Sequence, residues 1–317
     1  MPAHSMVARQ QIGIRYLTAL LIAGFVLAPP VSADTVACQS LPVGLQVLGS
    51  GGPELDDNRA STGYLLWHHG KARVLIDIGP GSMLRFDQSG ARLEDLEVIL
   101  LTHLHVDHSG DLPALLKGSF FSARTAELPL FGPSGSSRFP ATRDFVKALF
   151  GSQGGAFRYL GDYLSGEESF RLVAHDLPAV GEKPVTVLDD KRFRITAIPV
   201  QHGPVPALAW RVDLAGRSVA ISGDMNGNDH TLEILANGAD VLIAHHAIPE
   251  GATGVERQLH MPPSVIGRIA GTAKVKRLVL SHRMNRTLGH EAESLRLIRQ
   301  TYKGPVDLAD DSQCFAP

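Results

Sequence analysis

Short apolar runs, broken by glycine and proline, follow one another along most of the chain. They are rich in β-branched residues and are four to eight positions long, which is typical of buried strands. We predict strands at residues 45–48, 64–67, 74–78, 98–102, 128–131, 193–200, 208–212, 219–222, 241–244 and 278–281. A helical spacing of apolar positions predicts helices at 112–117, 142–150, 263–272 and 291–302. Along the chain, strands that form hairpins come first, and strands mixed with helices follow. This order predicts one layered α/β domain with two sheets and helices outside them.

The composition adds few constraints of its own. Apolar residues make up 44% and charged residues 20% of the 317 positions, and the formal net charge is −2. These values exclude a disordered, collagen-like or coiled-coil chain. They also give no indication of a surface built to bind nucleic acid or an anionic membrane. The unusual features are 14 histidines and a single pair of cysteines at opposite ends of the chain.

The first 33 residues resemble a secretory signal peptide. Arg9 and Arg15 stand in a region without acids, an apolar run covers 16–29, and small residues end at Ala33. The run is shorter than the roughly 20 residues of a membrane-spanning helix, so we expect no membrane anchor after cleavage. We predict a signal peptide at 1–33, a mature domain at 34–317 and a periplasmic or secreted location. Cleavage near Ala33 would lower the net charge from −2 to −4.

The two cysteines lie near the ends of the predicted mature chain. Cys38 and Cys314 are expected to form a disulfide, because exported proteins fold in an oxidising compartment. Lipidation of Cys38 is the alternative. It fits less well, because Thr35 is polar at a position where a lipoprotein signal needs an apolar residue.

A dense group of metal-ligand residue types follows the predicted strand at 98–102. His103, His105, Asp107 and His108 form the pattern H-x-H-x-D-H. His103 and His105 are two positions apart on extended chain, so they point the same way and can bind one ion. Asp107 and His108 would reach a second position as the chain turns into a helix. Imidazole and carboxylate donors favour zinc, with iron or manganese possible.

Three further candidates stand where later predicted strands end. They are His202, Asp224 and His282. Loops at one edge of a sheet converge on a single site, so we expect these side chains to join the H-x-H-x-D-H group.

The order of these residues resembles the metallo-β-lactamase fold superfamily, and within it the branch of ribonuclease Z and the zinc-dependent arylsulfatases. Supporting matches are LGSGGP at 48–53, LIDIG at 75–79 and KGS at 117–119. The resemblance implies an αββα sandwich with two zinc ions at one edge. The implied ligands are His103, His105 and His202 for the first ion, Asp107, His108 and His282 for the second, and Asp224 as a bridge between them. It also implies that Asp77 orients a ligand histidine.

The resemblance further implies a hydrolytic mechanism. A water between the two ions would lose a proton near neutral pH and attack a phosphoryl or sulfuryl ester. We place Asp107 and His260 in the catalytic machinery, with His260 as proton donor to the leaving group. Ribonuclease Z pairs such a histidine with a glutamate in a His-Glu-Ala segment. Here the segment is His245-His246-Ala247, so we expect His246 beside the ligands, and the missing glutamate argues against tRNA processing.

The substrate prediction depends on charge. In such enzymes a substrate-binding arm follows the position of Tyr163, and here that region is acidic, which would repel phosphates. Arg283 and Arg286 could instead bind a small anion. We therefore expect an exported dinuclear-zinc hydrolase of small sulfate or phosphate esters, arylsulfatase-like, with a small-molecule substrate, no nucleic-acid partner and, by analogy, a homodimeric state.

Three alternatives remain open at this point. The first is a ribonuclease Z-like phosphodiesterase, and the second is a lactone or thioester hydrolase. The third is a non-catalytic periplasmic protein that binds a metal or ligand on the same scaffold. The bridging carboxylate argues against this third alternative, because a protein that only binds a metal or ligand has no need of one.

Overall fold

Pairing of the apolar runs produces two seven-stranded sheets. The computed structural model describes residues 37–317, so the predicted signal peptide lies outside the described residues. The first sheet has the spatial order β14 (Cys314–Phe315), β1 (Val43–Gly49), β2 (Gly63–His68), β3 (Lys71–Ile78), β4 (Val98–Leu100), β5 (Leu128–Pro133) and β6 (Leu172–Leu177). The second has the order β13 (Val306–Leu308), β12 (Arg277–Ser281), β11 (Val241–His245), β10 (Arg217–Ile221), β9 (Val205–Leu214), β8 (Phe193–His202) and β7 (Val185–Asp189).

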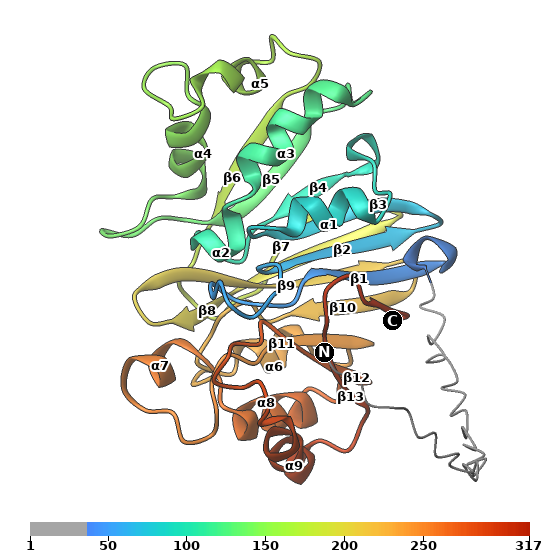
Figure 1. Cartoon of the computed structure of the whole chain (residues 1–317), viewed down its shortest axis with the longest axis vertical. Helices are drawn as coiled ribbons and strands as arrows, with labels where there is room; N and C mark the ends of the chain where they lie inside the picture. Colours follow the sequence, from blue (N-terminus) through green and yellow to red (C-terminus); the bar gives the residue numbers. More distant parts are fainter. Residues whose placement is uncertain (1–36) are drawn as a thin grey trace, which may run out of the picture. The chain divides into compact units, whose positions relative to one another are not determined.

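Helices lie outside the two sheets (Figure 1). Those from the first half of the chain are α1 (Ser82–Gln88), α2 (Val106–Ser109), α3 (Leu112–Gly118), α4 (Thr142–Phe150) and α5 (Asp162–Ser165). Those from the second half are α6 (Thr231–Leu235), α7 (Gly254–Leu259), α8 (Pro263–Thr272) and α9 (Glu291–Thr301). Within residues 37–317, no helix combines the length and the apolar character that crossing a membrane requires.

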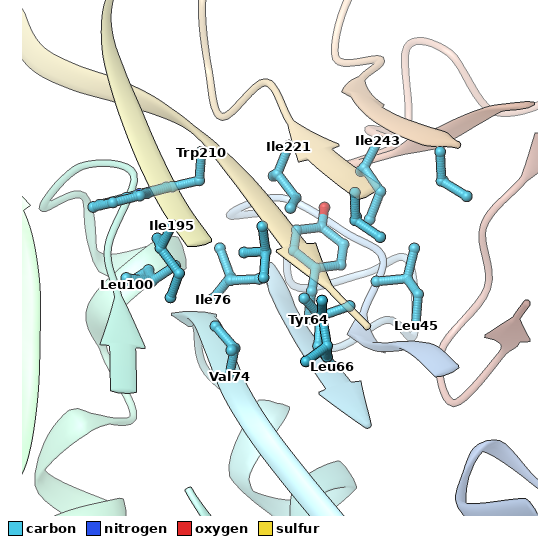
Figure 2. Packing of buried hydrophobic residues seen from close by; sticks show 14 of the residues in the cluster. Leu45, Tyr64, Leu66, Val74, Ile76, Leu100, Ile195, Trp210, Ile221 and Ile243 are labelled. Atoms are coloured by element: carbon cyan, nitrogen blue, oxygen red, sulfur yellow. The ribbon is translucent and has the colours of Figure 1, made fainter. Parts of the chain in front are cut away.

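The alternation of side chains along each strand divides the core into three layers. Ile76 of β3 points between the sheets and packs with Trp210 and Ile243 of the second sheet (Figure 2). Its neighbour Leu75 points outward, into a cluster shared with α1, α3 and α4. The outer face of the second sheet packs on α6, α8 and α9 in the same way. Both sheets therefore bury both faces, which confirms the predicted αββα sandwich.

The direction of the strands decides where a site can form. β10, β11 and β12 are parallel, and β8 runs the same way because it and β10 are both antiparallel to β9. In the first sheet β3, β4, β5 and β6 are parallel. The carboxyl ends of these strands each feed a loop at one edge of their sheet, where ligand-binding loops gather in layered α/β proteins.

All ten predicted strands and all four predicted helices are present. The strands that the sequence pattern missed are β6, β7, β13 and β14, which lie at the outer ends of the two sheets. Their side chains are half-exposed or the strands are only two or three residues long, so no apolar run marks them. The region after Tyr163, expected to correspond to a substrate-binding arm, instead contains β6 and β7.

Cys38 and Cys314 form the predicted disulfide across 276 positions of sequence, with Cα atoms 5.5 Å apart. β14 also pairs with β1, through Gln46 and Cys314. The start and the end of the described chain are therefore joined both covalently and through the first sheet.

Candidate metal centre

The H-x-H-x-D-H segment connects β4 to α2. His103 and His105 stand on the extended part, and Nε2 of His103 lies 3.0 Å from Nδ1 of His105. Asp107 and His108 stand in the single turn of α2, so the change from extended chain to helix turns them to a second position. His103 and His108 are fully buried. The segment thus presents two groups of donors, as the spacing predicts.

Asp224 lies between these two groups. Its Oδ2 is 3.9 Å from Nε2 of His103, 3.6 Å from Nε2 of His108 and 3.7 Å from Nε2 of His202. Its Oδ1 is 3.5 Å from Nε2 of His282. His202 ends β8, Asp224 follows β10 and His282 follows β12, so three strand ends of the second sheet meet the β4 loop of the first. The structure brings all seven predicted ligand residues together.

The donor atoms at this edge fall into groups that could hold metal ions. One contains His103, His105 and His202, and another contains His108, Asp224, His245 and His282. Oδ2 of Asp107 is 3.2 Å from Nε2 of His282 and 3.5 Å from Nε2 of His108. Nε2 of His108 and Nε2 of His202 are buried and have no hydrogen-bond partner among the described residues. Buried polar atoms without partners are rare and costly, and here several are directed at one another. Bound cations would satisfy these atoms, and imidazole with carboxylate donors suits zinc.

The electrostatics of the cluster separate the two kinds of side chain. Burial lowers the pKa of His103 and of His202. Burial would by itself raise the pKa of Asp224, but His282, His260 and His108 together hold that pKa well below its usual range. Asp107 is affected in the same way, and its pKa is also lowered. Both carboxylates are therefore ionised at neutral pH, which favours a cation between them.

Asp77 contacts one of the predicted ligand histidines. Its Oδ2 is 2.8 Å from Nδ1 of His108, which directs Nε2 of that ring into the centre. Asp77 also accepts hydrogen bonds from the backbone N–H and the hydroxyl of Thr102, at 2.7 and 2.8 Å. The carbonyl of Thr102 accepts from the backbone N–H of Leu208 in β9, at 2.8 Å. Thr102 therefore links the two sheets beside the site, a role that sequence reasoning missed.

His260 reaches the site from the loop after α7. Its Nδ1 is 3.8 Å from Oδ2 of Asp224, and its ring centre is 5.4 Å from that of His202. Burial lowers the pKa of His260 to about 3, although Asp224 opposes this. The neighbouring carbonyl of Leu259 lies 2.9 Å from Nδ1 of His202 and orients that ligand. The structure thus places the predicted proton donor next to the ligand cluster.

His246 does not lie where the prediction placed it. Its ring is buried, neither ring nitrogen has a hydrogen-bond partner among residues 37–317, and the charged groups that affect its pKa are Arg283 and Glu291. The preceding residue faces the site instead, because side chains alternate at the end of β11. Nδ1 of His245 is 2.7 Å from Oδ1 of Asp224. The sequence signals for His245 were its position at a strand end and its place as the first residue of the segment matched to His-Glu-Ala.

The two arginines after His282 form ion pairs and hydrogen bonds with other groups of the protein. Arg283 is buried, its guanidinium lies 2.6 Å from Glu291, and it donates to the carbonyl of Ala309. Arg286 pairs with Glu256 at 2.5 Å and donates to the carbonyl of Ala247 at 2.7 Å. These contacts count against the prediction that the two arginines bind a small anion, because protein groups occupy most of their donors; Nε of Arg283 is buried and has no hydrogen-bond partner among the described residues.

Two of the motif segments named above pack directly on the ligands. A Cβ atom at Gly79 would overlap the backbone carbonyl of Asp107, and one at Gly52 would lie 2.8 Å from Cε1 of His282. The glycines of LGSGGP and LIDIG therefore permit a close approach between these loops and the ligand residues.

Curated relatives match nearly the whole described chain. The ribonuclease Z of Mycobacterium avium (strain 104) is 32% identical over 285 residues, covering 84% of this chain and 95% of that protein. The ribonuclease Z of Anoxybacillus flavithermus (strain DSM 21510 / WK1) is 26% identical over 305 residues, with the same coverage of each.

Solved structures show the same fold. Human tRNase Z, short form, has a TM-score of 0.67 at 24% identity and covers 86% of this chain and 98% of its own. The metallo-β-lactamase fold protein YhfI from Bacillus subtilis has a TM-score of 0.67 at 20% identity, with 87% and 99% covered.

These relatives contradict the prediction of a small-molecule ester substrate without a nucleic-acid partner, because proteins related along this length are named as ribonucleases. The acidic region after Tyr163 was a poor guide, since several of its carboxylates are paired within the protein. The pairs are Asp176 with Arg143, Asp189 with Arg194, and Asp190 with Arg192. Their charge is therefore partly neutralised.

A family match agrees with both comparisons. Residues 72–283 match the family described as "Beta-lactamase superfamily domain". This range includes every predicted metal ligand from His103 to His282. The chain belongs to the metallo-β-lactamase superfamily, in the branch that contains ribonuclease Z.

Proposed function

We propose that this protein is a dinuclear metal-dependent phosphodiesterase that cleaves RNA or a similar phosphodiester. The observation that carries the proposal is the position of Asp224 between the two groups of ligands. Its Oδ2 lies 3.7 Å from Nε2 of His202 in one group and 3.6 Å from Nε2 of His108 in the other, and its Oδ1 lies 3.5 Å from Nε2 of His282. Such a carboxylate can hold two cations side by side. The ribonuclease Z relatives support the phosphodiester as substrate, and none of the similar proteins named above supports the arylsulfatase-like prediction.

The chain's own residues divide the work. When bound, two zinc ions would supply Lewis acidity for the phosphoryl oxygens and lower the pKa of a water molecule. His103, His105 and His202 would hold one ion, with Asp107, His108 and His282 at the other. A cavity of about 390 Å³ adjoins the β8–β9 turn, and its lining includes Gln201 and Gly203 on either side of His202.

The first experiment combines metal analysis with a substrate panel. Purified protein should contain close to two zinc ions per chain and hydrolyse an RNA oligonucleotide and bis-nitrophenyl phosphate. Nitrophenyl sulfate and a lactone should react more slowly. Asp224→Ala should abolish turnover and lower the zinc content, whereas Asp189→Ala, at an exposed surface pair, should change neither. Turnover of the sulfate or the lactone alone would overturn the proposal.

His260 is proposed to donate a ring N–H to the leaving oxygen, from a neutral ring because burial lowers its pKa to about 3. Its Nδ1 lies beside Asp224 and has no hydrogen-bond partner among the described side chains. A proton donor matters most for a poor leaving group. His260→Ala should therefore slow RNA cleavage by about 10²–10⁴-fold. It should slow bis-nitrophenyl phosphate hydrolysis, which releases a stable phenolate, much less.

The matched control is the exposed His230→Ala, which should behave as the wild type. Equal losses on both substrates in His260→Ala would show that His260 acts on the metal centre and not on the leaving group.

We also propose that the protein is exported after cleavage near Ala33. The Cys38–Cys314 disulfide supports this, since structural disulfides persist in oxidising compartments. Fractionation of expressing cells followed by N-terminal sequencing tests it. A full-length chain in the cytosolic fraction would contradict it.

A further inference from the structure

A polar group lies within the apolar layer between the two sheets. It is the hydroxyl of Tyr64, a fully buried residue of β2. In Figure 2 its ring extends from β2 toward the second sheet, and the hydroxyl ends near Ile221 and Ile243. A buried hydroxyl requires a hydrogen-bond partner. The partner is Nε2 of His245, at 3.0 Å.

Both ring nitrogens of His245 are occupied. Nδ1 lies 2.7 Å from Oδ1 of Asp224 and Nε2 lies 3.0 Å from the Tyr64 hydroxyl. An ionised carboxylate can only accept, so Nδ1 carries the proton. Nε2 then accepts, and the Tyr64 hydroxyl donates. The backbone N–H of His245 is also fixed, by a 3.1 Å hydrogen bond to the hydroxyl of Ser222.

We infer that Tyr64 and His245 are positioning residues that hold the bridging carboxylate of Asp224. The inference rests on the dinuclear centre of the proposed function. With Oδ1 accepting from His245, Oδ2 is turned toward the nitrogens of His108 and His202. The chain of contacts runs from the apolar core to the carboxylate through neutral hydrogen-bonding groups.

The competing role for His245 is that of an eighth ligand. Its donor atoms lie within 4.8 Å of those of His108, Asp224 and His282. To bind an ion, however, the ring would have to give up its bond to Asp224 or to Tyr64. The second choice would leave a buried hydroxyl without a partner between the sheets, which is unfavourable.

The test measures zinc affinity, by competition with a chromophoric chelator, in full-length folded protein. Tyr64→Phe keeps the ring and its packing but removes the donor. It should weaken zinc binding by about 10–100-fold, the usual effect of losing a group that orients a ligand. His245→Ala should weaken it at least as much, and His245→Asn should restore part of the loss, because its amide can donate to Asp224. The double variant Tyr64→Phe/His245→Ala should match His245→Ala alone.

Tyr163→Phe is the matched control, because Tyr163 is equally buried and its hydroxyl has no hydrogen-bond partner among the described residues. Its zinc affinity should equal that of the wild type. Unchanged affinity in Tyr64→Phe would overturn the inference. So would a double variant weaker than His245→Ala, or the loss of one of two zinc ions at saturation in His245→Ala.

A second measurement needs no variant. Nitrogen NMR of the wild-type protein should show His245 as the Nδ1–H tautomer. The Nε2–H tautomer would contradict the inferred hydrogen bonds, in which Tyr64 donates to His245 and His245 donates to Asp224. Neither readout requires turnover. If zinc affinity depends on Tyr64 and His245 as described but the protein leaves phosphodiesters intact, the proposed function is overturned and the inference is supported.

Discussion

At the scale of single residues, the centre depends on glycines, which have no side chain, as well as on the candidate ligands. Gly52 lies against the ring of His282, where an added methyl group would be 2.8 Å from Cε1. His282 itself has a backbone φ of 53°, a left-handed conformation that costs about 1–3 kcal/mol in a residue with a side chain. The surroundings of His282 thus hold a strained ligand in one position.

Gly52→Ala is expected to displace His282. The side chain cannot move away freely, because Nε2 faces Asp107 and Asp224. We expect the variant to unfold in urea near the wild-type midpoint but to retain only about one zinc ion per chain and little activity. Metal analysis after gel filtration measures this.

Gly118→Ala is the control for a glycine with open space around it. It ends α3 and should bind zinc normally, with equal or slightly higher stability. Two zinc ions in Gly52→Ala would mean that the loop at 51–53 moves aside at little cost.

At the scale of elements, the parallel strands of the second sheet are joined by side chains as well as by their ladder. Asp240, just before β11, accepts from the backbone N–H and the hydroxyl of Ser218 at 2.8 and 2.9 Å. It also accepts from Nζ of Lys276 at 2.7 Å. Burial would raise the pKa of Asp240, but these bonds outweigh it and lower the pKa. The carboxylate therefore aligns the starts of β10, β11 and β12.

Asp240→Asn should reduce the free energy of unfolding by about 1–3 kcal/mol at pH 7. Because the folded pKa is depressed, the carboxylate's contribution is complete above its unfolded value of about 3.9. It is lost as the pH falls through the folded value. The difference between wild type and variant should thus shrink below about pH 4.

Urea unfolding of both proteins at pH 7, 5 and 3.5 measures this. Other titrating groups, including the histidines, are common to both proteins and cancel in the difference. Asp189→Asn, at a 3.7 Å surface pair with Arg194, should stay within about 0.5 kcal/mol of wild type throughout. If the free energy of unfolding of Asp240→Asn lay below that of the wild type by the same amount at all three pH values, the effect of the substitution would come from packing and not from the lost charge.

The secondary-structure elements also show how much of the fold and of the site could be predicted from the sequence. Buried strands and long amphipathic helices leave a periodic signal, so β1, β3 and α8 were predictable. Edge strands such as β7 lack it because solvent covers one side. That the seven candidate ligand residues lie together was predictable, because residue type and strand ends identify them. His245 and Thr102 were not, since their roles depend on which face a strand end presents and on contacts between the sheets.

At the scale of the whole molecule, the described chain is closed by Cys38–Cys314. The same end of the chain is tied by Asp311, which accepts from the backbone N–H and the hydroxyl of Ser50 at 3.0 and 2.8 Å. Ser50 in turn accepts from the N–H of Arg283, next to the ligand His282. The C-terminal segment therefore supports the loop that borders the metal centre.

Replacing both cysteines by serine should lower the free energy of unfolding by about 2–4 kcal/mol. Chain-entropy arguments give about 5 kcal/mol as the upper end for so long a loop. Urea unfolding with and without dithiothreitol measures this. Reductant should destabilise the wild type and leave the double serine variant unchanged. Equal midpoints for oxidised wild type and the variant would show that β14 and Asp311 suffice to hold the end.

A closed chain has a different topology from an open one. Between residues 38 and 314 the polypeptide is a ring, and a single proteolytic cut in a ring yields one linear molecule, not two fragments. A protease that nicks an exposed loop, such as that at 178–184 between β6 and β7, would leave a species that migrates as one chain until it is reduced. In this protein, limited digestion therefore reports loop accessibility only when the gel contains reductant.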